Sequence, residues 1–275
     1  MKTHRLAILI TLFAIALAGC KGCKEGCTNP TALNYDADAT RDCCCEFPTK
    51  AKLKIKFHHR VNGNPFAYSQ SFDNGSGRMF DITLARFYMS NITLHRASGN
   101  FKFTDDTCTT NHFLLVTPDQ QTYDVGEFDP GSYTGISFTV GVDTVVNKTV
   151  YPAEKCVVTT TGHVLQNSDM HWGWNMGYIF LKLEGHADTT DVADGTLDGV
   201  MVYHTGTNPL ARTAMVDYNF SGVKEGTVTL DIIADYGALL NGIDLANDYR
   251  SHTDPPRLDV AIQVMNNASG MFSKL

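Results

Sequence analysis

From residue 51 onwards, hydrophobic and polar positions alternate along the chain with a period of two. In the first such stretch Leu53, Ile55, Phe57 and His59 share one face, while lysines and His58 occupy the other. This alternation is typical of a β-strand with one buried and one polar face. Similar segments, rich in Val, Ile, Thr, Phe and Tyr, predict strands near residues 80–96, 101–103, 112–117, 133–140, 177–184, 199–204, 214–219, 227–234 and 258–265.

The spacing of these strands indicates the fold class. No long helical pattern interrupts them, so we expect residues 51–275 to form an all-β domain, either an antiparallel β-sandwich or a sandwich-like barrel. Residues 236–248 are the exception, because their pattern predicts one short helix near the C-terminus.

The first 19 residues have a different character. Lys2 and Arg5 precede an apolar run over residues 6–18, which has the length of a signal-peptide core and is too short for a membrane-spanning helix. The run ends in LAGC, which resembles the lipobox of bacterial lipoproteins. This resemblance implies cleavage after residues 1–19 and lipidation of Cys20; the alternative is an ordinary signal peptide followed by a chance cysteine. We therefore expect a cell-envelope protein with a lipid anchor in the outer membrane or on the periplasmic face.

Charge and missing motifs argue against two classes of function. Loss of residues 1–19 leaves 256 residues with 20 Lys/Arg and 29 Asp/Glu, a formal charge of −9. An acidic chain without a basic cluster is a poor nucleic-acid binder, so we expect no nucleic-acid partner. The sequence also lacks a Gly-x-Ser-x-Gly elbow, a His-Glu-x-x-His zinc helix and a phosphate-binding glycine loop, so we expect no enzyme activity.

Residues 20–50 are dense in cysteine, and we interpret them as a stapled spacer. The segment resembles a GCTDPxAxNYxxxA module that is frequent in secreted proteins of Bacteroidetes-like bacteria. Disulfides are the default in an exported chain, although the run Cys43–Cys45 leaves soft-metal binding open. Asp36, Asp38 and Asp42 could hold Ca²⁺, but the glycine and closing Glu of an EF-hand loop are missing. The remaining cysteines are Cys20, Cys23, Cys27, Cys108 and Cys156.

Two histidines stand out because of their place in the alternation. His59 continues the apolar face of its strand, and His204 is in phase with Val200 and Val202, so both are predicted to point inward. Neutral imidazole is a common ligand of copper and zinc, and two inward histidines on different strands can meet at one ion. The alternative is that each is a hydrogen-bonded core histidine.

Residues 169–178 concentrate further reactive side chains. They contain Trp172, Trp174, His171 and two methionines. Imidazole and thioether suit Cu(I), and tryptophan is oxidisable or can stack on a ligand. The alternative is an aromatic hinge that leads into the next strand. The four aspartates within residues 188–198 are interpreted as a solvated loop, with Ca²⁺ as the alternative.

Five blocks of the chain, in order, resemble the MbnP-like family. FHHRVNG (57–63) resembles the family's first strand, and LARFYMSNITL (84–94) resembles its RYYISNIKL strand. PGSYTGISFTVGVD (130–143) is similar to PGxYxxIxFxxGVD, and YHTG (203–206) to FHxGG. The most specific block, MHWGWNMGYIFLKLEG (170–185), resembles GMxWxWNxGYxFxxxEG. The family includes periplasmic and surface copper proteins of methane-oxidising bacteria and many lipoproteins of Bacteroidetes.

The resemblance implies a β-sandwich domain with a copper site that serves uptake, storage or delivery. It implies that His59 and His204 are ligands, with His171 as an added one. It also implies that Trp172 or Trp174 is a candidate for oxidation to kynurenine by a dihaem peroxidase-like enzyme. The alternative is a surface adhesion or ligand-binding module without a metal, in which exposed aromatic side chains stack on sugar or protein.

Overall fold

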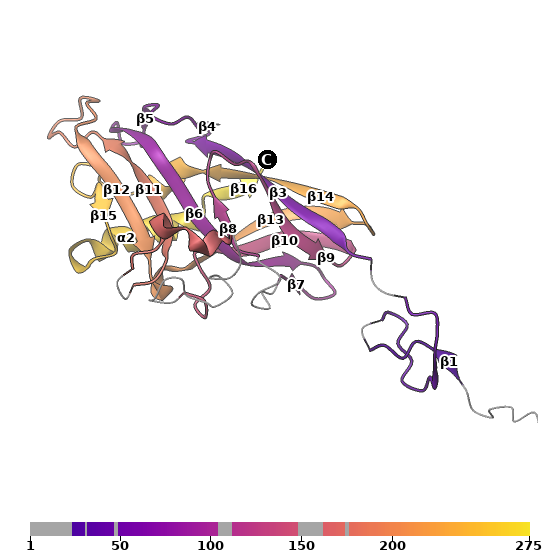
Figure 1. Cartoon of the computed structure of the whole chain (residues 1–275). Coiled ribbons are helices and arrows are strands. Elements are labelled where there is room, and N and C mark those ends of the chain that lie inside the picture. Colours follow the sequence, from indigo (N-terminus) through magenta and orange to yellow (C-terminus); the bar gives the residue numbers. More distant parts are fainter. Residues whose placement is uncertain (1–23, 31, 47–48, 104–111, 148–161, 174–175) are drawn as a thin grey trace, which may run out of the picture. The chain divides into compact units, whose positions relative to one another are not determined.

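The structure, a computed structural model, describes residues 24–275 except 31, 47–48, 104–111, 148–161 and 174–175 (Figure 1). The chain divides into two compact units, residues 1–48 and residues 49–275. Among the described residues no helix combines the length and apolar character needed to cross a bilayer. The signal segment with Cys20, and also Cys23, Cys108, Cys156 and Trp174, lie outside the described residues.

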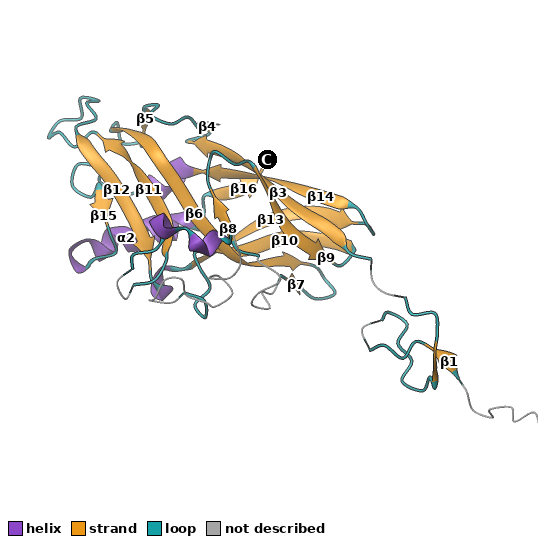
Figure 2. Cartoon of the chain, in the orientation of Figure 1, coloured by secondary structure: helices purple, strands orange, loops and turns teal. Residues whose placement is uncertain are grey.

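Two β-sheets form the larger unit (Figure 2). The nine-stranded sheet has the order β13-β10-β6-β11-β12-β15, and β5, β7 and β8 also pair with β6. Its strands are β5 (Phe72–Asp73), β6 (Met79–His95), β7 (Phe101–Lys102), β8 (Leu114–Val116), β10 (Gly131–Val140), β11 (Ile179–Ala187), β12 (Gly199–Gly206), β13 (Arg212–Gly222) and β15 (Arg250–Ser251).

The five-stranded sheet has the order β16-β14-β3-β4, with β9 also paired to β3. Its strands are β3 (Ala51–Val61), β4 (Asn64–Pro65), β9 (Thr122–Phe128), β14 (Thr227–Asp235) and β16 (Phe272–Lys274). In the smaller unit, β1 (Glu25–Gly26) and β2 (Arg41–Asp42) form a short parallel pair.

Aromatic side chains fill the space between the two large sheets. Phe57 of β3 contacts Phe87 of β6 edge to face, with ring centroids 6.1 Å apart. Phe272 of β16 contacts Phe87 at 5.5 Å and Phe138 of β10 at 4.8 Å. All four side chains are buried. The predicted all-β sandwich is therefore confirmed, because its inward rows come from both sheets.

The sheets are mixed rather than wholly antiparallel. β3 pairs with β14 in parallel along Lys52–Arg60 and Thr227–Asp235, and β12 pairs in parallel with β15. Most other pairs of the larger unit are antiparallel, as predicted. The period-two pattern defines the faces of a strand but carries no information about the direction of its partner, which explains the difference.

Three strands of the five-stranded sheet, β4, β9 and β16, were missed by the sequence pattern. In β9, Tyr123 and Val125 alternate normally, but Gly126 then adopts a φ of 140° and the register with β3 shifts. The shift brings Phe128 to the buried face in the opposite phase. Such a bulge interrupts the alternation on which the prediction depends.

The short C-terminal helix is present, but at a different position. Residues 258–265 were expected to form a strand, whereas α2 (Leu258–Ala268) is an α-helix. Its buried residues Val260, Ala261, Val264, Met265 and Ala268 follow the helical spacing of three and four. In the predicted helical segment, residues Tyr236–Leu240 form only a 3₁₀ helix.

The helical assignment of α2 predicts unequal effects at two nearby positions. In a strand, residues 262 and 264 would share one face; in α2, Val264 is fully buried and Ile262 is 38% exposed. We expect Val264→Ala to lower the free energy of unfolding by about 2 kcal/mol and Ile262→Ala by less than about 1 kcal/mol. Urea denaturation measures both; equal losses would contradict the helix.

Candidate metal centre

His59 lies between the sheets, as its place in the alternation predicts. Its ring stacks on Tyr236 at a centroid distance of 5.8 Å and lies 5.9 Å from the ring of Phe57. Nδ1 is 3.0 Å from the Tyr236 hydroxyl. Nε2 is buried and makes no hydrogen bond of normal geometry with any described residue.

Burial keeps this imidazole neutral. Desolvation lowers the pKa of His59 to about 4, against the smaller opposing effects of the Gln120 backbone and the Asp119 carboxylate. The ring is therefore neutral at neutral pH and is hydrogen-bonded through Nδ1.

His204 lies on the opposite side of its strand from the one predicted. In β12, Met201, Tyr203 and Thr205 are buried, whereas Val200 is 54% exposed and shares its face with His204. Thr205 donates to the sulfur of Met265 in α2 at 2.9 Å, which identifies the inner face. Both phases of this strand carry apolar residues, so the sequence pattern could not determine which phase points inward.

Glu184 and His252 surround His204 on this outer face. Nε2 of His204 is 2.7 Å from Oε1 of Glu184 on β11. The ring of His252 lies perpendicular to that of His204, with centroids 4.7 Å apart. Lys182, directly opposite His204 in the sheet, places Nζ 3.3 Å from the same carboxylate oxygen.

Backbone pairing brings His252 to this position. β15 pairs with Val202 and Tyr203 of β12. The next turn is held by Thr253, whose hydroxyl donates to the His204 carbonyl at 3.1 Å and accepts from the Gly206 amide at 3.2 Å. Sequence reasoning missed His252 because it belongs to no alternating segment. In the sequence His252 is simply a histidine in a turn, and its spatial neighbour, His204, is distant in the chain.

The electrostatics of this group favour neutral imidazole beside a charged carboxylate. Burial lowers the pKa of His204, and the hydrogen bond to Glu184 opposes that shift. For Glu184, burial raises the pKa, but the bonds from His204 and Lys182 outweigh it and lower the pKa overall. Neutral imidazole is the form that binds copper or zinc.

Trp172 covers the end of β12 next to His204. A Cβ added at Gly206 would lie 2.4 Å from Cζ3 of Trp172, so the indole occupies the space of the missing side chain. Gly206 is buried and lies two residues after His204, at the end of β12. The indole is partly buried and packs against the core.

His171 has Gly173 and Tyr178 as partners. Its side chain is 8% exposed, its Nδ1 accepts a hydrogen bond from the Gly173 amide at 2.9 Å, and its ring contacts Tyr178 at 4.7 Å. His59, on the other sheet, faces the interior, whereas His204 faces outward. The structure thus places His204 beside His252, and the predicted inward orientation of His204 is wrong.

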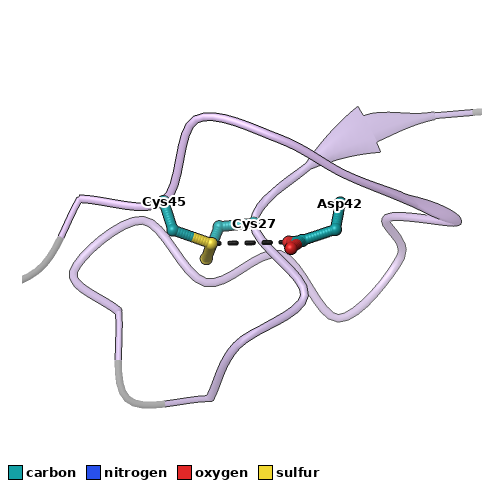
Figure 3. Close-up of side chains that lie close together, drawn as sticks. All are labelled: Cys27, Asp42 and Cys45. Atoms are coloured by element: carbon teal, nitrogen blue, oxygen red, sulfur yellow. Dashed lines mark hydrogen bonds between the residues drawn. A yellow bond between two sulfur atoms is a disulfide. The ribbon is translucent and has the colours of Figure 1, made fainter.

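The cysteine segment is stapled by disulfides. Cys27 pairs with Cys45, and Cys43 pairs with Cys44. Cys27, Asp42 and Cys45 are the one group of three or more His, Cys, Asp or Glu in the described residues whose donor atoms lie within 4.8 Å of one another (Figure 3). Because both sulfurs are in a disulfide, they offer no thiolate to a metal.

The aspartates proposed for Ca²⁺ have protein partners. Asp42 accepts from the amide and hydroxyl of Thr28, both at 3.0 Å, and these bonds lower its pKa. Asp36 pairs with Lys24 at 2.7 Å. Asp188 is not solvated as expected: it is fully buried and binds Thr190, Gly195 and Arg78, so that it anchors its own loop.

Comparison with known proteins places this domain in a family. The family model described as MbnP matches residues 50–256. The chain belongs to the MbnP family. The solved structure of MbnP from Methylosinus trichosporium is similar in fold, with a TM-score of 0.52 and 19% sequence identity over 77% of this chain and 87% of that one. No curated protein matches the chain significantly.

The buried state of His59 predicts a pH-dependent stability. The unfolded imidazole takes up a proton near pH 6.5, but the folded one does so only near pH 4, so the unfolded state binds more protons between these values. The contribution of neutral His59 to the free energy of unfolding is fully present above pH 6.5. As the pH falls to 4, about 2–3 kcal/mol of it is lost. Urea denaturation at several pH values should show a smaller loss for His59→Gln than for the wild type or His58→Gln. Equal slopes of the free energy of unfolding against pH in all three proteins would contradict the lowered pKa of His59.

Proposed function

We propose that this MbnP-family domain binds one copper ion through His204 and His252 on the outer face of its nine-stranded sheet. The carrying observation is the pair of adjacent imidazole rings, 4.7 Å apart, one of which is oriented by a carboxylate. Imidazole nitrogens suit copper, and carboxylate-oriented histidines are a recurrent arrangement in metal sites. The donor set therefore fits the metal that the family resemblance implies.

Trp172 and its surroundings extend the proposal. The indole packs against Gly206, two residues from His204 in β12, so oxidation of Trp172 to kynurenine would place a carbonyl and an amine at that end of the strand. A dihaem peroxidase-like enzyme is the proposed partner for that step, and Trp174 remains the other candidate. The competing function, surface adhesion through exposed tryptophan, gains less support, because Trp172 is packed against the core.

Copper binding predicts a specific set of variants. In a titration of Cu(I) against a chromophoric chelator, we expect the full chain to bind one equivalent. His204→Ala and His252→Ala should lose this binding or weaken the Cu(I) affinity by at least about tenfold, since each variant removes one of two ligands. His95→Ala, on β6 with its ring on Ser137, is the matched control and should bind as the wild type does. Unchanged binding in both ligand variants would exclude this site.

We also propose that the protein is a lipoprotein of the cell envelope that holds copper for uptake, storage or delivery. The support is the basic, apolar and LAGC sequence of the first 20 residues. Expressed in a bacterium with the lipoprotein pathway, the wild type should incorporate labelled fatty acid and partition into detergent. Cys20→Ala should do neither, while Cys108→Ala should behave as the wild type. Labelling of the Cys20→Ala protein would contradict the anchor.

A further inference from the structure

Lys182, Glu184 and His204 form a row of contacts in which Glu184 lies between the other two side chains. Lys182 and His204 lie directly opposite each other on β11 and β12, and Glu184 reaches diagonally between them. Its Oε1 lies 2.7 Å from His204 Nε2 and 3.3 Å from Lys182 Nζ. The side chain of Lys182 is only 15% exposed, so the ammonium group is held against the sheet.

This arrangement selects one tautomer of the imidazole. A carboxylate only accepts hydrogen bonds, so the nitrogen 2.7 Å from Glu184 must carry a hydrogen. In neutral His204 the other nitrogen, Nδ1, then has no hydrogen and offers a lone pair. Nδ1 makes no hydrogen bond with any described residue, and the neighbouring ring is that of His252. Lys182 strengthens the selection, because an ammonium beside Glu184 favours the charged, purely accepting carboxylate.

We infer that Glu184 is a positioning residue that holds His204 with its proton on Nε2 and thereby leaves Nδ1, with its lone pair, as the metal-binding nitrogen. The metal part of this inference rests on the proposed function. The tautomer is a property of the metal-free protein and is tested without copper. Mutation of a residue that hydrogen-bonds a metal-ligating histidine in this way typically lowers metal affinity by about 10- to 100-fold.

The first test is nitrogen NMR of histidine-labelled, metal-free protein. His204 of the wild type should show a protonated Nε2 and an unprotonated Nδ1, with the assignment made by His204→Gln. Glu184→Gln keeps an accepting oxygen and should keep this tautomer, whereas Glu184→Ala removes the acceptor and should give a mixture. A hydrogen on Nδ1 in the wild type, or an unchanged tautomer in Glu184→Ala, would overturn the inference.

The second test is the Cu(I) affinity of the same variants in the full chain. Glu184→Ala should weaken binding by about 10- to 100-fold and Glu184→Gln by less. Glu127→Ala, an exposed glutamate on β9 of the other sheet, is the control and should bind as the wild type does. Unchanged affinity in Glu184→Ala, in a protein that binds copper, would overturn the role of Glu184 alone. Absence of copper binding in a wild type with the expected tautomer would overturn the proposed function, and the metal role of Glu184 with it.

Discussion

The aromatic layer between the two sheets is the constraint on which the other features depend. Phe57, Phe87 and Phe272 contact one another across that layer, and each fixes which side of its strand is inside. Because side chains alternate along a strand, one buried residue determines the orientation of all its neighbours. The same rule places two histidines on different sides of their sheets: His59 packs beside Tyr236 between the sheets, and His204 lies on the outer face with polar neighbours.

This division separates two kinds of histidine chemistry in one domain. The inner imidazole, His59, is partly buried, and desolvation lowers its pKa so that it stays neutral. The outer imidazole has a carboxylate on one nitrogen and a second histidine beside its ring. Only the second arrangement has a carboxylate that orients the ring and a second histidine next to it.

Sequence pattern predicted the fold class and most strands, because burial of one strand face leaves a direct period-two signal. The period-two pattern failed where a β-bulge or a helical spacing replaced simple alternation. In β9 a bulge at Gly126 broke the alternation, and in α2 a run of apolar residues with helical spacing was assigned to a strand. It predicted His204 as a candidate but not its side, since β12 is apolar on both faces. His252 could not be found at all, because its neighbourhood to His204 arises from the pairing of β15 with β12.

Gly206 contacts both Trp172 and the turn that carries His252. Because Gly206 has no side chain, the indole of Trp172 fits against its backbone. The amide of Gly206 also donates a hydrogen bond to Thr253, in the turn that carries His252. A single backbone position therefore holds an oxidisable ring on one side and a histidine turn on the other. Any chemical change that alters the size of that ring must be accommodated at Gly206, and so reaches the strand end that carries His204.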